Sequence, residues 1–289
     1  MGAAEAVGWI GLGRIGRPMA ARVAAAGHAL TLWARRPEAA RPAVADVEGL
    51  AAAAAWADDA EALVQRCSIV CTVVGGPADV QALHARLMPQ ARPGTLFIDF
   101  TTAAPSTATA AAALAQRHGL QVLDVPVTGG VAGAHRGTLT GFVGGDPAAL
   151  ERARPLLSAM CARLVPCGGP GAGYRVKLVN QTLVAGVLMG LADGARLARA
   201  VGLDATQLQG ALAGGTAASA LLEAYWPRMC SGDGAVSFTL ALMQKDLRLA
   251  RDEAQALDVP APMLDAALAA VRAAIERDGP QAGVQRLAA

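Results

Sequence analysis

The sequence predicts an α/β protein in which a doubly wound, parallel β-sheet is followed by an all-α region joined by a long helix. Three observations support this fold class. In the first half of the chain, short apolar runs alternate with alanine-rich helical stretches. After the glycine-rich residues 168–173, the pattern is helical nearly to the carboxyl terminus. Aromatic residues make up only 3% of the chain, which favours close helix packing over an aromatic-rich β-sandwich.

Five apolar runs in the first half are predicted to be strands. Each run is mostly apolar, which is typical of strands buried on both faces of a parallel sheet. Helical stretches separate the runs, and such βαβ units connect by right-handed crossovers. The alanine run 51–55 is predicted to be helical. The five predicted strands are residues 7–10, 30–33, 69–74, 96–100 and 121–125.

The second half is predicted to be a separate helical domain. At about 100–200 residues per domain, the length of the chain indicates two domains. We place the boundary near residue 166, which gives domains of residues 1–166 and 167–289. Residues 174–201 are predicted to form one long helix that Gly202 caps, because its internal glycines cost only about 1 kcal/mol each. The apolar run 183–192 inside it is too short to span a bilayer and is predicted to be buried.

Charge and cysteine content argue against several classes of function. The 25 basic and 23 acidic residues form no block of like charge, so nucleic-acid binding is not expected. The five cysteines form no CxxC pair and no Cys/His cluster, so we expect no metal site and a reducing compartment. Residues 1–8 show no basic segment before an apolar stretch. We therefore expect a cytoplasmic protein without a membrane partner.

A glycine motif lies between the first predicted strand and a helical stretch. In a Rossmann-like doubly wound sheet, such a motif lets the backbone approach the pyrophosphate of a dinucleotide at a helix amino terminus. Three glycines would also serve any tight turn from strand to helix, but the surrounding strand and helix favour a dinucleotide. The motif consists of Gly11, Leu12, Gly13, Arg14, Ile15 and Gly16.

The residues after the second predicted strand bear on the choice of cofactor. NAD-binding enzymes place an Asp or Glu there to bind the ribose 2′-hydroxyl, whereas this chain has Arg35 and Arg36. A guanidinium presents a planar fork of donors that suits a 2′-phosphate. NADP is therefore predicted, with NAD as the less favoured cofactor. Two solvated loop arginines are the alternative interpretation.

A glycine-rich loop after the last predicted strand is a candidate for binding a carboxylate. Thr128, Gly129 and Gly130 combine a hydroxyl with backbone N–H groups of small residues, which suit an anion at the carboxyl edge of a sheet. Turn formation alone would explain these residues equally well.

A polar cluster near the start of the long predicted helix is a candidate for acid/base chemistry. Lys177, Asn180 and Gln181 share one helix face because they are three and four residues apart. A partly desolvated lysine has a lowered pKa that suits proton transfer. An exposed lysine in the first turn of the helix is the alternative interpretation.

Five motifs, in order along the chain, resemble those of the β-hydroxyacid dehydrogenase family. That family includes 3-hydroxyisobutyrate dehydrogenase, tartronate semialdehyde reductase and the glyoxylate/succinic semialdehyde reductases. The resemblance spans nearly the whole chain and implies a Rossmann domain, a long helix and an all-α domain that builds a homodimer or homotetramer. The motifs are residues 7–20, residues 98–102 with Pro105, residues 124–139, residues 171–181, and Phe238 with Lys245, Asp246 and Leu247.

The resemblance also implies roles for single residues. Lys177 corresponds to the catalytic lysine and Asn180 to its hydrogen-bonding companion. Thr128, with Gly129 and Gly130, occupies the family's Ser-Gly-Gly substrate anchor, where threonine keeps the hydroxyl but adds a methyl group that narrows the pocket.

Three further positions follow from the same resemblance. Gln181 is expected near the substrate, and its pairing with the preceding asparagine resembles the tartronate semialdehyde reductase branch. Thr102 and Lys245 fall at positions that contact the cofactor.

The predicted reaction is hydride transfer between NADP(H) and a small carboxylate-bearing substrate. The substrate would be a semialdehyde or β-hydroxy acid of the 3-hydroxyisobutyrate, tartronate semialdehyde or glyoxylate/succinic semialdehyde type, with Lys177 exchanging the proton. Two alternatives stay open: an imine reductase of the same architecture, and a non-catalytic NADP(H)-binding protein. Imine reductases usually lack this lysine, which argues against the first alternative.

Overall fold

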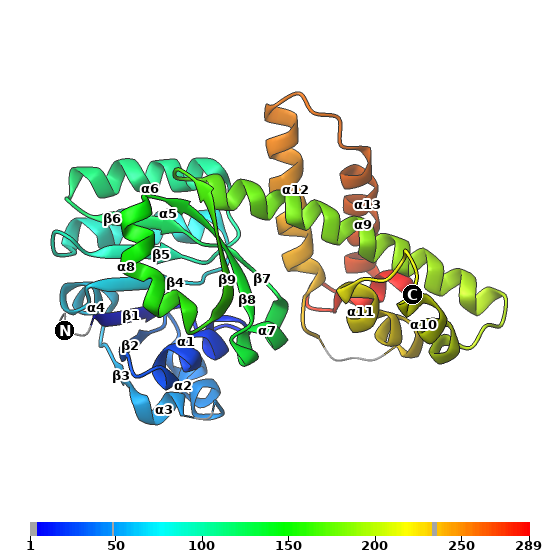
Figure 1. Cartoon of the computed structure of the whole chain (residues 1–289), viewed down its shortest axis with the longest axis horizontal. Coiled ribbons are helices and arrows are strands. Elements are labelled where there is room, and N and C mark those ends of the chain that lie inside the picture. Colours follow the sequence, from blue (N-terminus) through cyan, green and yellow to red (C-terminus); the bar gives the residue numbers. More distant parts are fainter. Residues whose placement is uncertain (1–4, 48, 233–235) are drawn as a thin grey trace. The chain divides into compact units, whose positions relative to one another are not determined.

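The chain divides into two compact units, Met1–Lys177 and Leu178–Ala289 (Figure 1). The computed structural model describes residues 5–47, 49–232 and 236–289. The first half of the segment considered above for an export signal, residues 1–4, therefore lies outside the described residues. The division falls within one long helix, whereas residue 166, the predicted domain boundary, lies inside the last strand of the sheet.

The first unit is built around a sheet whose six leading strands are all parallel. Their order across the sheet is β3-β2-β1-β4-β5-β6, which is the strand order of a dinucleotide-binding fold, and it confirms the predicted doubly wound architecture. The chain reverses direction across the sheet between β1 and β4, so ligands are expected at the carboxyl ends of these strands. The strands are β1 (Ala6–Ile10), β2 (Ala29–Trp33), β3 (Ala54–Trp56), β4 (Ile69–Thr72), β5 (Leu96–Asp99) and β6 (Gln121–Asp124).

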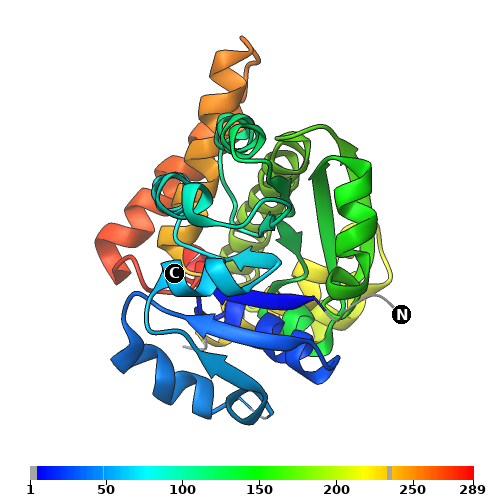
Figure 2. The same ribbon diagram turned by 90° about the vertical axis from the view of Figure 1, so that its left-hand side faces the viewer.

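Helices cover both faces of this sheet (Figures 1 and 2). Alternate residues of each strand point to opposite faces: Leu96 and Ile98 of β5 join one buried cluster, and Phe97 joins the other. One face packs against α1 (Gly16–Ala25), α2 (Pro37–Ala45), α3 (Leu50–Ala53), α7 (Gly130–Arg136) and α8 (Pro147–Ser158). The other packs against α4 (Ala60–Arg66), α5 (Pro77–Leu87) and α6 (Pro105–Arg117).

Four strands were not predicted. β3 begins inside the alanine run that was predicted to be helical; only its first residues are helical, because Ala54 pairs with Leu30 of β2. Three more strands extend the sheet beyond β6, namely β7 (Val127–Thr128), β8 (Leu139–Gly145) and β9 (Cys161–Gly168). β8 runs antiparallel to β6 and β7, so the expectation of a purely parallel sheet was wrong for this edge.

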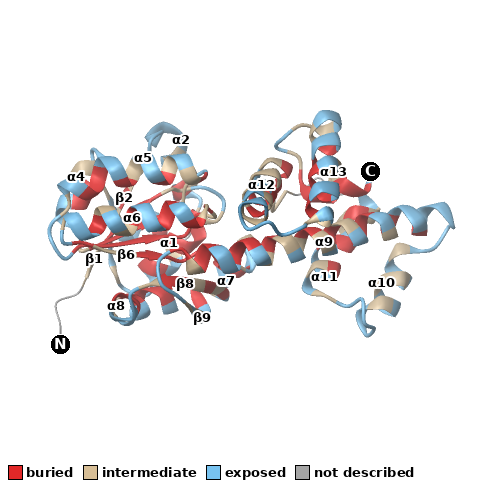
Figure 3. Cartoon of the chain, turned by 90° about the horizontal axis from the view of Figure 1, so that it is seen from above, coloured by how far each residue is buried: buried red, intermediate tan, exposed pale blue. Residues whose placement is uncertain are grey.

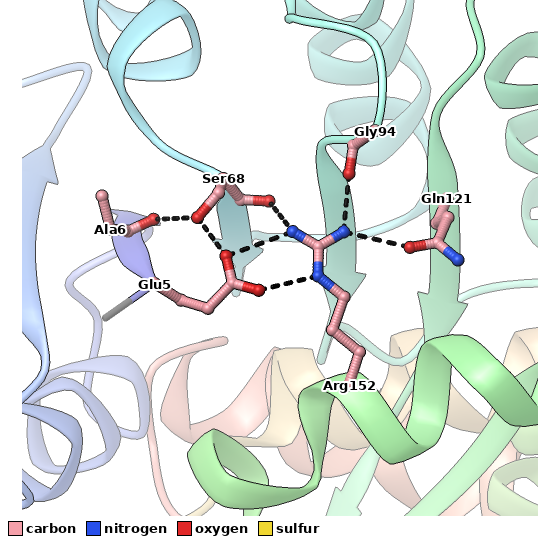
Figure 4. A network of polar contacts seen from close by, with 6 residues as sticks. All are labelled: Glu5, Ala6, Ser68, Gly94, Gln121 and Arg152. Atoms are coloured by element: carbon pink, nitrogen blue, oxygen red, sulfur yellow. Dashed lines mark hydrogen bonds and ion pairs between the residues drawn. The ribbon is translucent and has the colours of Figure 1, made fainter. Parts of the chain in front are cut away.

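Arg152 of α8 connects the amino-terminal ends of four strands (Figure 4). Its guanidinium donates to Glu5 Oε1 at 2.8 Å, to Gly94 O at 2.6 Å, to Gln121 Oε1 at 3.0 Å and to Ser68 O at 3.1 Å. The hydrogen bond from Arg152 holds the pKa of Glu5 below its ordinary value. This network lies at the edge opposite the one at which ligands are expected, so we assign it a structural role.

Among its described residues the second unit consists of helices and one isolated β-bridge. Its core is formed mainly by one face of each of its four longest helices, where buried residues are coloured red in Figure 3. Four different helices contribute side chains to one buried cluster, which includes Leu188, Trp226, Leu247 and Val271. The helices are α9 (Ala172–Ala200), which starts in the first unit, α10 (Ala205–Ala213), α11 (Ala220–Ser231), α12 (Leu240–Ala256) and α13 (Pro262–Asp278), with a short 3₁₀ turn, η2 (Val284–Ala288).

The long helix α9 agrees with its predicted bounds to within two residues at each end. Gly202 has φ +70°, and the N–H of Leu203 donates to Ala198 O at 3.0 Å, which is the glycine cap expected from the sequence. By length and composition alone, α9 would pass for a membrane-spanning helix. The prediction that residues 183–192 are buried was wrong for one face, since Leu183 is 67% exposed while Leu188 is fully buried.

Candidate active site

The glycine motif forms the loop between β1 and α1, and its three glycines have different surroundings. A Cβ at Gly11, where φ is +107°, would lie 1.9 Å from Val73 O, and a Cβ at Gly16 would lie 2.1 Å from Gly11 O. These two positions exclude any other residue because the backbone itself is too close. A Cβ at Gly13 would meet nothing within 4 Å. The loop therefore leaves open space at its middle glycine, which is the space that a pyrophosphate against the backbone requires.

The start of α1 supports this interpretation. The residue at the helix N-cap is Ile15, whose side chain has no oxygen with which to accept a backbone N–H. Leu12 and Ile15 pack against the core of the sheet, and Arg14 is exposed. The first turn of the helix thus presents backbone donors and a partial positive charge to an anion. The residues present fit a dinucleotide.

Arg35 and Arg36 lie on the surface after β2, as a phosphate-binding pair would. Arg35 is 76% exposed, and its Nη1 lies 3.4 Å from Asp79 Oδ1 in the first turn of α5. Arg35, which was predicted to bind the 2′-phosphate, thus has a carboxylate partner in Asp79. The sequence did not reveal this pair because the two residues are 44 positions apart.

The loops after β4 and β5 are tied together at the same edge of the sheet. The N–H of Val74 donates to Thr101 Oγ1 at 3.0 Å. The half-buried Thr102, predicted to contact the cofactor, follows directly. Since the carboxyl ends of parallel strands share one edge, this places Thr102 on the edge that carries the glycine motif.

Lys177 lies in the first turns of α9 and is only 7% exposed, so the alternative of an exposed lysine does not hold. Its Nζ donates to Val127 O at 2.8 Å. Val127 directly precedes Thr128, which is half-buried in β7. The structure therefore brings together two clusters that the sequence analysis treated separately, the lysine and the Thr-Gly-Gly loop.

Gly129 and Gly130 have φ values of +122° and +65°. Both values lie in the left-handed region that favours glycine, and they turn the chain from β7 into α7. A larger residue would strain this turn, which explains two consecutive glycines after Thr128. Both residues are exposed.

Two buried carboxylates hold the segment that leads into Lys177. Asp124 accepts hydrogen bonds from the N–H of Gly171 at 2.8 Å and of Tyr174 at 2.9 Å. The Tyr174 hydroxyl donates to Asp99. Burial raises the pKa of Asp124 to about 6, against the opposing effect of the two N–H donors, and burial raises the pKa of Tyr174 well above its ordinary value.

In the second unit, the other predicted residues form a connected hydrogen-bonded group. Asn180 Nδ2 donates to Gln181 Oε1 at 2.9 Å, and Gln181 Nε2 donates to Asp246 Oδ2 at 2.6 Å. Lys245 Nζ lies 2.9 Å from Asp246 Oδ1. Asp246, which the sequence analysis gave no role, thus links three predicted residues, and its place beside Lys245 was the available signal. The described residues include no group of three His, Cys, Asp or Glu side chains that could hold a metal.

Two family models together match almost the whole chain. The NAD binding domain of 6-phosphogluconate dehydrogenase matches residues 6–169, and the NAD-binding region of NADP-dependent 3-hydroxyisobutyrate dehydrogenase matches residues 171–289. The NAD-dependent L-serine dehydrogenase of Pseudomonas aeruginosa is 37% identical over 277 residues, which cover 92% of this chain and 91% of that protein. The chain belongs to the β-hydroxyacid dehydrogenase family.

Solved structures agree with this assignment. A 3-hydroxyisobutyrate dehydrogenase of Mycobacterium tuberculosis with L-serine matches with a TM-score of 0.86 at 32% identity, covering 99% of this chain and 98% of that one. Psf3 in complex with NADP⁺ and 2-OPP matches with a TM-score of 0.88 at 27% identity, covering 98% of each chain. The predicted family and fold class are confirmed, and the protein is an enzyme of the NAD(P)-dependent hydroxyacid dehydrogenase type. The names of its relatives include both cofactors and more than one substrate.

Proposed function

We propose that the protein transfers a hydride reversibly between NADP(H) and a small carboxylate-bearing β-hydroxy acid or semialdehyde. The observation that carries this proposal is the buried Lys177, whose Nζ lies 2.8 Å from Val127 O, directly beside Thr128. An ammonium group that exchanges a proton, held beside a loop that anchors a carboxylate, suits a substrate that carries an oxygen and a carboxylate a few bonds apart.

Each side chain has one task in this reaction. The nicotinamide, when bound, supplies the hydride chemistry. During reduction Lys177 donates a proton to the carbonyl oxygen, and during oxidation it takes the proton back from the hydroxyl group. Asn180, three residues further along α9, orients the same oxygen, and Gln181 lies beside it on the helix. Thr128 and the N–H groups of Gly129 and Gly130 hold the substrate carboxylate.

The choice of NADP over NAD rests on Arg35 and Arg36. Both are exposed at the end of β2, where a carboxylate would bind the ribose of NAD. Asp79 pairs with Arg35, so a 2′-phosphate that binds the guanidinium displaces this carboxylate. Thr102 and Lys245 are proposed as further cofactor contacts.

The proposed substrates share one chemical pattern. The names of the relatives contain L-serine and 3-hydroxyisobutyrate, and both compounds carry a carboxylate, one central carbon and a hydroxymethyl group. The methyl group of Thr128 takes space beside the anchor and favours a small group on the central carbon. We propose this class of compound, including the aldehyde form in tartronate semialdehyde, for the present chain. Glyoxylate and succinic semialdehyde, in which the carbonyl carbon lies nearer to or further from the carboxylate, remain candidates for the same site.

The experiment that tests the function measures NADPH oxidation with a panel of carboxylate-bearing aldehydes and NADP⁺ reduction with L-serine and 3-hydroxyisobutyrate. NADH and a cyclic imine serve as controls. Turnover of one acid with NADP(H) supports the proposal and names the substrate. Turnover of the imine alone would assign the chain to the imine reductases, and tight NADPH binding without any turnover would make it a non-catalytic binding protein.

We also propose that the protein is a cytoplasmic homodimer or homotetramer. The second unit exposes an apolar stripe along α9, which we define as Val179, Leu183, Val187, Leu197 and, just beyond the end of the helix, Val201. These residues recur at helical spacing, and a continuous apolar stripe is typical of a surface that another chain covers. The five free cysteines suit a reducing compartment.

A further inference from the structure

We propose that Asp124 is the positioning residue for Lys177: its carboxylate holds the backbone at the start of α9 so that Lys177 Nζ meets Val127 O. The inference rests on the proposed function, because it assigns Asp124 a part in the proton transfer that Lys177 performs.

The carboxylate of Asp124 is fixed in one place. The residue ends β6, is 3% exposed, and accepts the N–H groups of Gly171 and Tyr174. Two glycines pack directly against it: a Cβ at Gly144 would lie 2.5 Å from Asp124 Oδ1, and a Cβ at Gly173 would lie 2.8 Å from Asp124 Oδ2. The backbone therefore approaches the carboxylate as closely as glycine allows, and the start of α9 has no room to shift toward the sheet.

A second carboxylate holds the same residue of α9 by its side chain. Asp99 is the register partner of Asp124 on the neighbouring strand β5. It is itself held by Thr72 Oγ1 at 2.7 Å, and it accepts the hydroxyl of Tyr174. Asp124 of β6 thus holds the N–H of Tyr174, and Asp99 of β5 holds its hydroxyl group. Two contacts at different atoms restrain both the position of this first helical turn and its rotation about the helix axis.

These contacts connect Asp124 to Lys177 through the first turns of α9. Lys177 follows Tyr174 by three residues and lies on the same side of the helix one turn later. Its Nζ reaches Val127 O, and Val127 follows Asp124 by three residues along the chain. Asp124 therefore holds the start of the helix that carries the ammonium group, and it lies three residues before the carbonyl that accepts from that group. Release of Asp124 displaces Nζ from the substrate anchor, and small displacements of a reacting group are costly in rate.

The test compares Asp124→Asn with Asp146→Asn. Asp146 caps α8 in the same way, accepting from Ala148 N at 2.6 Å, but its helix carries no proposed site residue. In Asp124→Asn we expect kcat to fall about tenfold or more, with the Kd for NADPH changed by less than about twofold. The Asp146→Asn variant should keep the kcat of the wild-type enzyme. A wild-type kcat in a folded Asp124→Asn variant would overturn the proposal.

A double-mutant cycle with Lys177→Ala separates positioning from general stabilisation. If Asp124 acts through the lysine, Asp124→Asn lowers kcat in the wild-type background but has no further effect in the Lys177→Ala background. Independent, multiplicative effects would overturn the proposal. A Lys177→Ala variant with full activity would instead contradict the proposed function itself.

If Asp124→Asn does not fold, Asp124→Ser supplies the test, because it removes the carboxylate that accepts both N–H groups and adds no bulk against Gly144 and Gly173. It should lower kcat in the wild-type background and leave kcat unchanged in the Lys177→Ala background. An unchanged kcat in folded Asp124→Ser would overturn the proposal in that case.

The pH profile gives an independent measurement. As the pH falls through about 6, Asp124 takes up a proton and loses an acceptor site, so kcat of the wild-type enzyme should fall. The groups that face Asp124 are Asp99, Tyr174 and Cys167, and burial raises the pKa of the last two. His84 faces Asp99 from α5, and burial lowers its pKa. The acidic limb should disappear in Asp124→Asn and persist in His84→Gln; the reverse result would overturn the proposal.

Discussion

At the scale of single residues, Lys177 combines burial with a specific hydrogen bond. A buried ammonium group is costly unless polar partners compensate it, and Val127 O supplies one such partner at 2.8 Å. The bond orients Nζ toward the loop in which Thr128 begins the proposed substrate anchor. The lysine is therefore held at a defined point, as the proposed role of a general acid that gains rate by orientation requires.

Replacement of this lysine should remove the proton transfer without removing the cofactor site. We expect Lys177→Ala to lower kcat about a hundredfold or more, with a nearly unchanged Kd for NADPH, because a positioned acid contributes a factor of this size. Steady-state kinetics and NADPH fluorescence titration measure the two quantities. The matched control is Arg175→Ala, because Arg175 is exposed and lies on the same turn of the helix. Full turnover in Lys177→Ala would refute the assignment.

The pair of Arg35 and Asp79 should control cofactor preference in opposite directions. Arg35→Ala should lower kcat/KM with NADPH by about tenfold and change it little with NADH, since only NADPH carries the 2′-phosphate. Asp79→Asn should raise the NADPH/NADH ratio, because the carboxylate both competes for the guanidinium and repels the phosphate.

The matched control for this pair is Arg117→Ala, an exposed arginine at the carboxyl end of α6. The measurement is the ratio of the kcat/KM value with NADPH to that with NADH, for the wild type and for each variant. An Asp79→Asn ratio equal to that of the wild type would remove Asp79 from the cofactor site, and a wild-type preference for NADH would remove the NADP proposal.

At the scale of elements, the sequence predicted what depends on local composition. The mostly apolar runs of β1, β2, β4, β5 and β6 were predicted to within two residues at each end. The apolar character of a strand buried on both faces is visible in its own sequence, without knowledge of the strands it pairs with. β8 contains Gly141, Gly144 and Gly145 and becomes a strand only through pairing with its neighbours. The hydrogen bond between Asp124 and Gly171 joins residues 47 positions apart, so the spacing of motifs along the chain did not reveal it.

The apolar stripe on α9 predicts an effect on assembly. Leu183→Lys should convert the oligomer to a monomer at micromolar concentration, because a charge at the centre of an apolar interface is desolvated without a partner. Light scattering after size-exclusion chromatography measures the mass. Leu257→Lys is the control, since Leu257 is 64% exposed at the end of α12 and lies outside the stripe. A monomeric wild-type protein, or an unchanged mass for Leu183→Lys, would contradict the proposed interface.

At the scale of the whole molecule, the two edges of the sheet have separate tasks. The carboxyl edge carries the glycine motif, Thr102 and the loop that begins at Thr128. The amino edge is held by Arg152, which connects α8 to the beginnings of four strands (Figure 4). Substitutions at the amino edge should therefore change stability and leave the chemistry intact.

Arg152→Ala should lower the free energy of unfolding by about 1–3 kcal/mol, because it leaves several partly buried acceptors without a donor. The loss should depend on pH. The pKa of Glu5 is held below its ordinary value of 4.5 in the folded protein, so this contribution is complete above pH 4.5 and is lost as the pH falls through the folded pKa. The raised pKa of Asp124 acts in the opposite sense, but it is common to both proteins and cancels in the difference.

Denaturant unfolding at several pH values measures this effect. Arg154→Ala is the control on the same helix, because Arg154 pairs with the exposed Glu151 at the surface, and it should leave the free energy of unfolding nearly unchanged. A difference between Arg152→Ala and wild type that stays constant down to strongly acidic pH would contradict the role given to Glu5.

The glycine motif has a consequence for how this sequence can diverge. Gly11 and Gly16 are required by the backbone that surrounds them, whereas the open space at Gly13 places no demand on the empty fold. A descendant of this gene that lost its enzymatic role would therefore be free to replace Gly13 first while keeping the other two. A substitution at Gly13 can therefore leave the fold intact while it removes the space for the cofactor. We expect related chains that no longer bind a dinucleotide to differ at this position before they differ at the other two glycines.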